Sequence, residues 1–185
     1  MLNIAAVQEK LVYRDGIAPT VDGVRPRLTP QLLARLKTEA GYDDAVAARS
    51  YPQAAFDGVV KIIAAELYGA DPDEATFQLG LQVMMRYRDS VAGKAIFPVI
   101  RFLGPMRFLK RIPSFFRLVN NYADVKVDVT GKSTFLMEHN EVGEVPHYFR
   151  GVMQGSAAVV GLGRPACELL EYDGHRGKYR VSWAE

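Results

Sequence analysis

The sequence has a single cysteine, Cys167, and only three histidines among its 185 residues. One cysteine excludes an internal disulfide and every zinc motif that needs several cysteines, and it is compatible with a reducing cytoplasm. No Gly-x-Ser-x-Gly nucleophile elbow is present. Gly161-x-Gly163 follows a predicted helix, so it is not a dinucleotide-binding fingerprint. These absences lead us to expect a protein that is not an enzyme.

Long apolar runs and a strong net charge are also missing. Lys, Arg or Gly interrupts each apolar stretch before it reaches the roughly 18 residues that a membrane span requires. The formal net charge of +2 gives no overall basic footprint for nucleic acid. Glu9 and Lys10 lie near the N-terminus and no long apolar core precedes them, so we expect no secretory signal. The sequence predicts a cytoplasmic protein that has no transmembrane segment and binds no nucleic acid.

Length and composition predict one domain, residues 1–185, with a sizeable core. Residues 1–28 are expected to be a lead-in hairpin and connector, because Asp15-Gly16 and a Gly/Pro/Asp-rich stretch follow a short β-like run. Residues 29–118 are expected to be mainly helical. Residues 119–185 are expected to form a sheet with an inserted helix.

Capping signals and residue periodicity support this division. Thr29-Pro30 and Asp71-Pro72 are typical of helix starts. Residues 95–103 are almost entirely apolar, which predicts a helix buried on most sides. Alternating valines over 125–129 indicate a strand, and a second hairpin is predicted over 167–183. The fold class is therefore α+β: a helical bundle packed on an antiparallel sheet of about four strands, with one helix inserted between two C-terminal hairpins.

The candidate chemical groups are few. His139 and His147 are eight residues apart with a glycine and a proline between them, so their spacing does not predict a metal site, and a structural or surface role is favoured. His175 lies in a predicted turn. Cys167 lies in a predicted strand, where packing is favoured over nucleophilic catalysis. We therefore predict no catalytic residue and no metal ligand.

A basic aromatic segment precedes the first hairpin. Its cations alternate with phenylalanines and include Arg101, Arg107, Lys110, Arg111 and Arg117. Such a segment can bind phosphates, an acidic partner or a membrane surface. Alternatively, the phenylalanines face the core while the cations reach water, and the spacing of Phe108, Ile112 and Phe115 favours this interpretation.

Small and polar residues have structural explanations. The helix face from Gly151 to Ala158 consists largely of small residues, which favours close packing over space for a ligand. Asn120-Asn121-Tyr122 and Asn140 to Gly143 are interpreted as two ends of one hairpin that fixes the sheet against the helices.

Several motifs together resemble an uncharacterised bacterial family of myxobacterial type, known only as a domain of unknown function. They are Leu103-Gly104-Pro105, Asn120-Asn121-Tyr122, Asn140-Glu141-Val142-Gly143 and Gly151 to Gly155. More distantly, the helix–sheet order is similar to the haem nitric-oxide/oxygen-binding domain, the four-vinyl-reductase domain and TRAPP-type trafficking subunits. This resemblance implies a scaffold that encloses a pocket between helices and sheet, or one that serves assembly.

The same resemblance implies how a haem would be held. The haem-binding relatives supply a histidine from the helix before the sheet, but Met106 to Arg117 contains none. Their Tyr-x-Ser-x-Arg motif is also absent, because Tyr87-Arg88-Asp89-Ser90 does not reproduce it. We therefore expect no haem and no other cofactor.

The leading hypothesis is a non-enzymatic small-molecule-binding or regulatory sensor domain that binds an apolar or anionic molecule. Its expected pocket lies between helices and sheet and is lined by Phe97, Ile100, Arg101, Phe115, Phe116, Arg117, Tyr122 and Phe149. The alternative is a protein–protein assembly module, either a homodimer or a partner scaffold. A third hypothesis is haem or other tetrapyrrole binding through His139 or His147.

Overall fold

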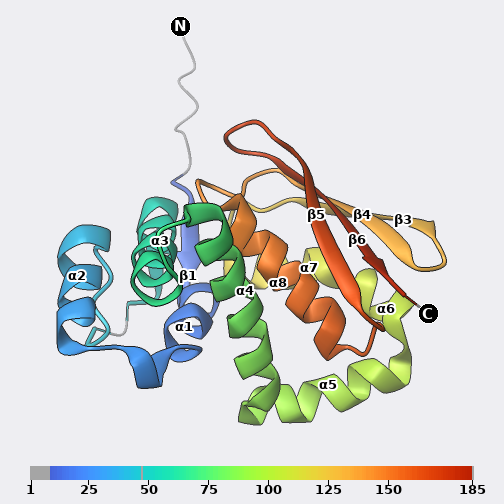
Figure 1. Ribbon diagram of the computed structural model, residues 1–185, viewed down its shortest axis with the longest axis horizontal. Coiled ribbons are helices and arrows are strands. Elements are labelled where there is room, and N and C mark those ends of the chain that lie inside the picture. The colour runs from blue at the N-terminus through green and yellow to red at the C-terminus, as the bar shows by residue number, and fades with distance from the viewer. Residues whose placement is uncertain (1–8, 47, 185) are drawn as a thin grey trace, which may run out of the picture.

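The computed structural model describes residues 9–46 and 48–184, apart from the side chains at 92, 101, 103, 105 and 106. The described helices are α1 (Arg14–Asp22), α2 (Pro30–Ala40), α3 (Gln53–Tyr68), α4 (Pro72–Asp89), α5 (Val91–Leu103), α6 (Pro105–Leu109), α7 (Ile112–Val119) and α8 (Pro146–Val159). The strands are β1 (Leu11–Tyr13), β2 (Ser50–Pro52), β3 (Val125–Gly131), β4 (Thr134–His139), β5 (Pro165–Tyr172) and β6 (Gly177–Trp183). The fold is α+β, as predicted, with α8 inserted between the hairpins β3–β4 and β5–β6 (Figure 1).

The main sheet has the strand order β3-β4-β6-β5, and each neighbouring pair is antiparallel. Alternate residues of β4, namely Phe135, Met137 and His139, are buried, because successive side chains of a strand point to opposite faces. Tyr179 and Val181 of β6 pair with Met137 and Phe135 and are also buried. Helix α8 packs alongside this sheet (Figure 1).

The hydrophobic core consists of two clusters that meet at α8. One cluster lies among the N-terminal helices and includes Phe56 and Leu79. The other lies between the sheet and helices α5 to α8. Phe149 and Val152 of α8 pack against both clusters. Helix α8 therefore connects the helical half of the molecule to the sheet.

The small residues of α8 allow α4 to approach closely. A Cβ atom added at Gly151 would lie 2.1 Å from the backbone carbonyl oxygen of Phe77, and one added at Gly80 would lie 2.1 Å from that of Tyr148. Both contacts are much shorter than van der Waals distance. The interpretation of the small-residue face as a close-packing surface is therefore confirmed.

The expectation of an N-terminal hairpin and connector over 1–28 is wrong for the described residues. β1 pairs with β2, about forty residues further along the chain, and not with an adjacent strand. Asn121 reinforces its position, because its Oδ1 accepts a 2.8 Å hydrogen bond from the N–H of Leu11.

The rest of that N-terminal segment is helical where turn residues suggested a connector. Helix α1 forms despite Gly16 and Pro19, because Ile17 and Val21 are completely buried in the N-terminal core cluster. Burial of this kind outweighs weak local helix propensity. The turn signal at Asp15-Gly16 was local, whereas the packing that decides the conformation is not.

Helix α5 also differs from expectation. It begins at Val91 rather than at residue 95, and the hydroxyl of Ser90 accepts a 3.0 Å hydrogen bond from the N–H of Gly93. It was expected to be buried on most sides, yet Val91 and Phe102 are both 90% exposed. The reason is its position along one edge of the molecule, where it packs mainly on α4 and α6 (Figure 1). Of the helices described, none combines the length and apolarity that crossing a bilayer requires.

Candidate functional site

The eight residues predicted to line a pocket do not lie in one place. Phe97 is buried, and its ring centroid lies 5.9 Å from that of Tyr87 in an edge-to-face contact. Ile100 is half-buried. Phe115 and Arg117 of α7 are exposed, and Arg117 lies 3.7 Å from Asp124. The side chain of Arg101 lies outside the described residues.

Two of the predicted residues, Phe116 and Phe149, pack against the core cluster between the helices and the sheet. Phe116 of α7 and Phe149 of α8 have ring centroids 6.1 Å apart. Tyr122, just before β3, is half-buried against the N-terminal core cluster, and burial raises the pKa of its hydroxyl. Whether any of these residues contacts a ligand stays a prediction.

A residue assigned to structure or surface, His139, lies against the same two phenylalanines. Its ring centroid is 4.7 Å from Phe116 and 5.2 Å from Phe149. The side chain is at the end of β4, and the residue is only 1% exposed. We call the layer of Phe116, His139 and Phe149 the aromatic seam. The sequence carried a signal for it, since His139 continues the two-residue period of Phe135 and Met137.

Burial in the aromatic seam keeps the ring of His139 neutral, and one hydrogen bond determines which nitrogen carries the proton. Burial lowers the pKa of His139 to about 4, so the ring is neutral at pH 7. Its Nδ1 accepts a 3.1 Å hydrogen bond from the backbone N–H of Glu141. Because a backbone N–H can only donate, the lone pair is on Nδ1 and the proton is on Nε2. That Nε2 is buried and has no hydrogen-bond partner within the described part of the chain.

Two buried carboxylates lie in or next to the loop that follows His139. Glu141 accepts hydrogen bonds from Lys10, from Gln53 and from the N–H of Gly143. Burial acts to raise its pKa, but these bonds outweigh it and the pKa is lowered. Asp57 of α3 lacks most of that support, and burial raises its pKa to about 6.

Asp57 ties this loop to α3. Its Oδ2 accepts a 3.1 Å hydrogen bond from the N–H of Glu144, while its Oδ1 is buried with no partner among the described residues. Only glycine fits at position 143 of this loop, for two reasons. Its φ is +57°, and an added Cβ would lie 2.3 Å from Oδ2 of Asp57. The loop from Asn140 to Val145 is therefore fixed between the seam and α3.

Two surface grooves border these elements. One, of about 470 Å³, lies over the ends of the two hairpins, and its mixed lining includes Lys126, Glu138, His139, Tyr172 and Arg176. It brings solvent close to the edge of the seam.

The second groove, of about 350 Å³, lies between α3, α4 and the start of α8. It includes His147, whose Nε2 is 3.5 Å from a carboxylate oxygen of Asp73. The two histidines considered for ligand binding therefore occupy different places.

The described residues do not support metal binding by a cluster of side chains or nucleophilic catalysis by Cys167. Across residues 9–46 and 48–184, no three His, Cys, Asp or Glu side chains are grouped so that they could hold a metal ion. Cys167 is buried, and burial raises the pKa of its thiol to about 12. A thiol with so high a pKa is a poor nucleophile at neutral pH.

Residues 11–184 match the profile of a family described as "Protein of unknown function (DUF2378)". The chain belongs to this family. No curated protein matches the sequence. The resemblance noted in the motifs is therefore confirmed, and the DUF2378 description assigns no activity to its members.

Solved structures show which fold this DUF2378 member shares. A variant of Tt H-NOX has a TM-score of 0.66 at 16% identity, covering 94% of this chain and 95% of that one. An oxygen-binding H-NOX domain related to soluble guanylate cyclases has a TM-score of 0.64 at 16% identity, and the match covers 91% of this chain and 93% of that one. A structure described as probing the function of heme distortion in the H-NOX family has a TM-score of 0.62 at 17% identity, and the match covers 90% of this chain and 92% of that one. The chain has the H-NOX fold, and the second of these structures is described as an oxygen complex.

These structures correct one expectation. The prediction that the chain takes no cofactor is wrong, because the solved structures that share its fold include domains described by their heme and their oxygen complex. The prediction relied on the missing histidine over Met106 to Arg117. It overlooked that the fold places a different buried imidazole, His139, against the helix in that segment.

Proposed function

We propose that this chain is a non-catalytic sensor domain that binds a haem or related tetrapyrrole at the aromatic seam, with His139 as the iron ligand. The observation that carries the proposal is the buried Nε2 of His139, for which the described residues offer no partner. A buried polar group without a hydrogen bond costs about 1–3 kcal/mol. Structural histidines are therefore normally satisfied, and a bound group that engaged Nε2 would remove this cost.

The walls of the seam suit a planar apolar ligand. Phe116 and Phe149 come from two different helices and both contact the ring of His139. Ligand sites are typically apolar with a few well-placed polar groups. Both rings contact the ring of His139 directly, so a bound ligand would have to displace them from it.

The protonation of His139 suits ligation in one respect and opposes it in another. The ring is neutral, since its pKa is about 4, and a neutral imidazole nitrogen could ligate haem iron. Its proton, however, is on Nε2 and must move to Nδ1. The N–H of Glu141 then loses its acceptor. The Nδ1–H and the N–H of Glu141 are then two buried donors that face each other without an acceptor. An unsatisfied buried donor costs about 1–3 kcal/mol, which an iron–imidazole bond would have to offset.

This proton shift gives ligand binding a route to the rest of the molecule. Glu141 belongs to the loop before α8, and its carboxylate is bonded to Lys10 at β1 and to Gln53 of α3. A change at Nδ1 of His139 therefore acts on a loop that is tied to both of these elements. We infer that this loop carries the signal of a sensor.

Ligand class is tested first by native mass spectrometry of the purified chain and by thermal unfolding with added ligands. We expect haem to raise the unfolding midpoint, because a ligand that binds the folded state stabilises it. Palmitate and benzoate, as apolar and anionic probes, should not. Metal-free protoporphyrin should stabilise less than haem. Equal stabilisation by both would contradict ligation of iron by His139, and no stabilisation by either would overturn the proposed function.

A further inference from the structure

Charge is distributed unevenly along this chain. Residues 91–119 contain six of the 23 lysines and arginines and none of the 21 aspartates and glutamates. This segment therefore carries +6 while the remainder of the chain carries −4. It comprises α5, which runs along the lower edge of the view in Figure 1, α6 at the end of α5, and α7, which lies further in and contacts β3. We call it the basic segment.

The same segment carries most of the exposed large apolar side chains. Of the eleven found among the described residues, six belong to it: Val91, Ile96, Val99, Phe102, Phe115 and Leu118. On α5, Val91, Val99 and Phe102 fall on one face at helical spacing, opposite the buried Gly93 and Phe97. A helix that is apolar all round is normally covered on all sides. The outer face of α5, in contrast, is exposed to solvent.

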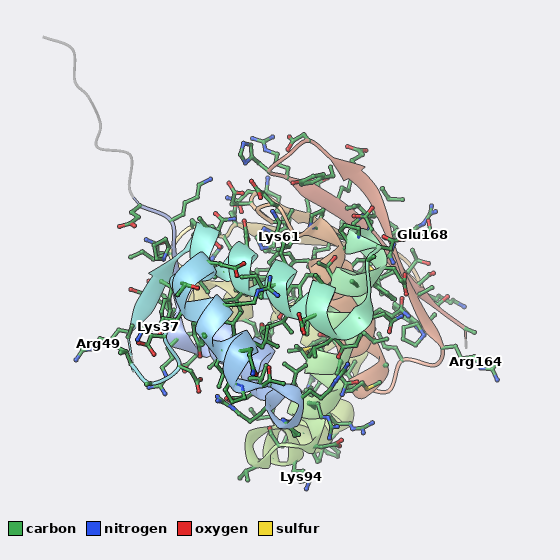
Figure 2. The ribbon with its side chains drawn as sticks, turned by 60° about the vertical axis from the view of Figure 1, so that its left-hand side comes forward. Lys37, Arg49, Lys61, Lys94, Arg164 and Glu168 are labelled. Atoms are coloured by element: carbon green, nitrogen blue, oxygen red, sulfur yellow. The ribbon has the colours of Figure 1, made fainter. Side chains whose placement is uncertain are left out.

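The cations of the basic segment are available for an external partner. Lys94, Arg107, Lys110 and Arg111 are exposed, and none forms an ion pair with an acidic side chain in the described part of the chain. Figure 2 shows Lys94 projecting from the end of the molecule where α5 lies. An apolar surface of this kind, bordered by unpaired positive charge, marks an interaction site.

We propose that the basic segment docks this protein on an anionic lipid bilayer, with α5 lying in the plane of the interface. Amphipathic interfacial helices combine exposed Phe and Leu with flanking Lys and Arg, and they bind anionic headgroups. The absence of any acidic residue from 91–119 matches a negatively charged surface. Helix α5 has 13 residues, fewer than the about 20 needed to span a membrane. The segment therefore lies on the bilayer and does not cross it.

The test is co-sedimentation of the full chain with vesicles of phosphatidylcholine alone or mixed with phosphatidylglycerol. We expect binding to the anionic vesicles, weakened by salt, and little binding to the neutral ones. Phe102→Ser and the double variant Lys110→Glu/Arg111→Glu should each weaken binding by at least about tenfold. The matched controls are Leu170→Ser and Lys126→Glu, at exposed positions on the sheet, and both should bind as the unmodified chain does.

A second readout reports the depth of insertion. The chain has one tryptophan, Trp183, on β6. Phe102→Trp should therefore add an emission component that shifts to the blue with anionic vesicles, whereas Leu170→Trp should not. Failure of the unmodified chain to bind anionic vesicles would overturn the proposal. So would equal losses in the control variants, or concentration-dependent dimerisation abolished by Phe102→Ser without any vesicle binding, which would assign the surface to a second copy of the chain.

Discussion

At the scale of single residues, two buried titratable groups beside the same loop respond to pH in opposite directions. The pKa of Asp57 is raised by burial from 3.8 to about 6, and that of His139 is lowered by burial from 6.5 to about 4. The stability that protonated Asp57 contributes is complete below about pH 3.8 and is lost as pH rises through 6. The stability that neutral His139 contributes is complete above about pH 6.5 and is lost as pH falls through 4.

Asp57→Asn should separate these two contributions. The amide cannot ionise, so the variant avoids the cost of a buried carboxylate above pH 6. Relative to the unmodified chain, its free energy of unfolding should rise by up to about 3 kcal/mol between pH 4 and pH 7. Urea unfolding at the two pH values measures this difference. Asp128→Asn, at an exposed position on β3, controls for the removal of one carboxylate. A difference that does not change with pH would show that Asp57 titrates as it does in the unfolded chain.

At the scale of elements, α4 and α8 pack in close backbone contact. The backbones approach so closely at Gly80 and Gly151 that no side chain fits. Because the opposing atoms are backbone atoms, one helix must move as a whole to admit a methyl group.

Gly151→Ala should therefore be strongly destabilising, by about 3 kcal/mol, because overpacking forces the helices apart. Gly131→Ala is the control, since its added Cβ would meet its nearest neighbour, Thr134, at 3.8 Å. We expect it to change the free energy of unfolding by less than about 1 kcal/mol. Chemical denaturation of both variants makes the comparison. Equal effects would contradict the close packing of α4 on α8.

The sequence predicted the elements whose ends are set by interactions between residues close together in the chain. The side chain of Thr29 caps α2 by accepting a hydrogen bond from the N–H of Leu32, and Asp71 caps α4. Each cap lies within four residues of the groups it bonds. Helix α1 and the pairing of β1 with β2 depend on contacts with distant segments, so local patterns could not reveal them. Helix α5 was recognised, but its exposure depends on where the tertiary fold places it.

At the scale of the whole molecule, the candidate site lies where the two core clusters meet. Phe149 packs against both clusters and against His139. The sequence placed Phe116 and Phe149 in a pocket between helices and sheet, and they do lie between these layers. It did not place His139 with them, because the burial of a strand end depends on which helices cover it. The basic segment reaches this region through Phe116 of α7. The residues changed to test docking, Phe102, Lys110 and Arg111, are not part of the aromatic seam, so their variants separate membrane docking from ligand binding.

The central claim, that His139 holds the ligand, is tested most directly by absorption spectroscopy of the full chain during titration with haem. We expect a saturable Soret shift that weakens at least about tenfold in His139→Ala and persists in His147→Ala, the matched control in a separate groove. Added imidazole should restore the shift in His139→Ala, provided that its circular dichroism shows an intact fold. A shift that depends on His147, or no Soret shift in the unmodified chain, would contradict the account.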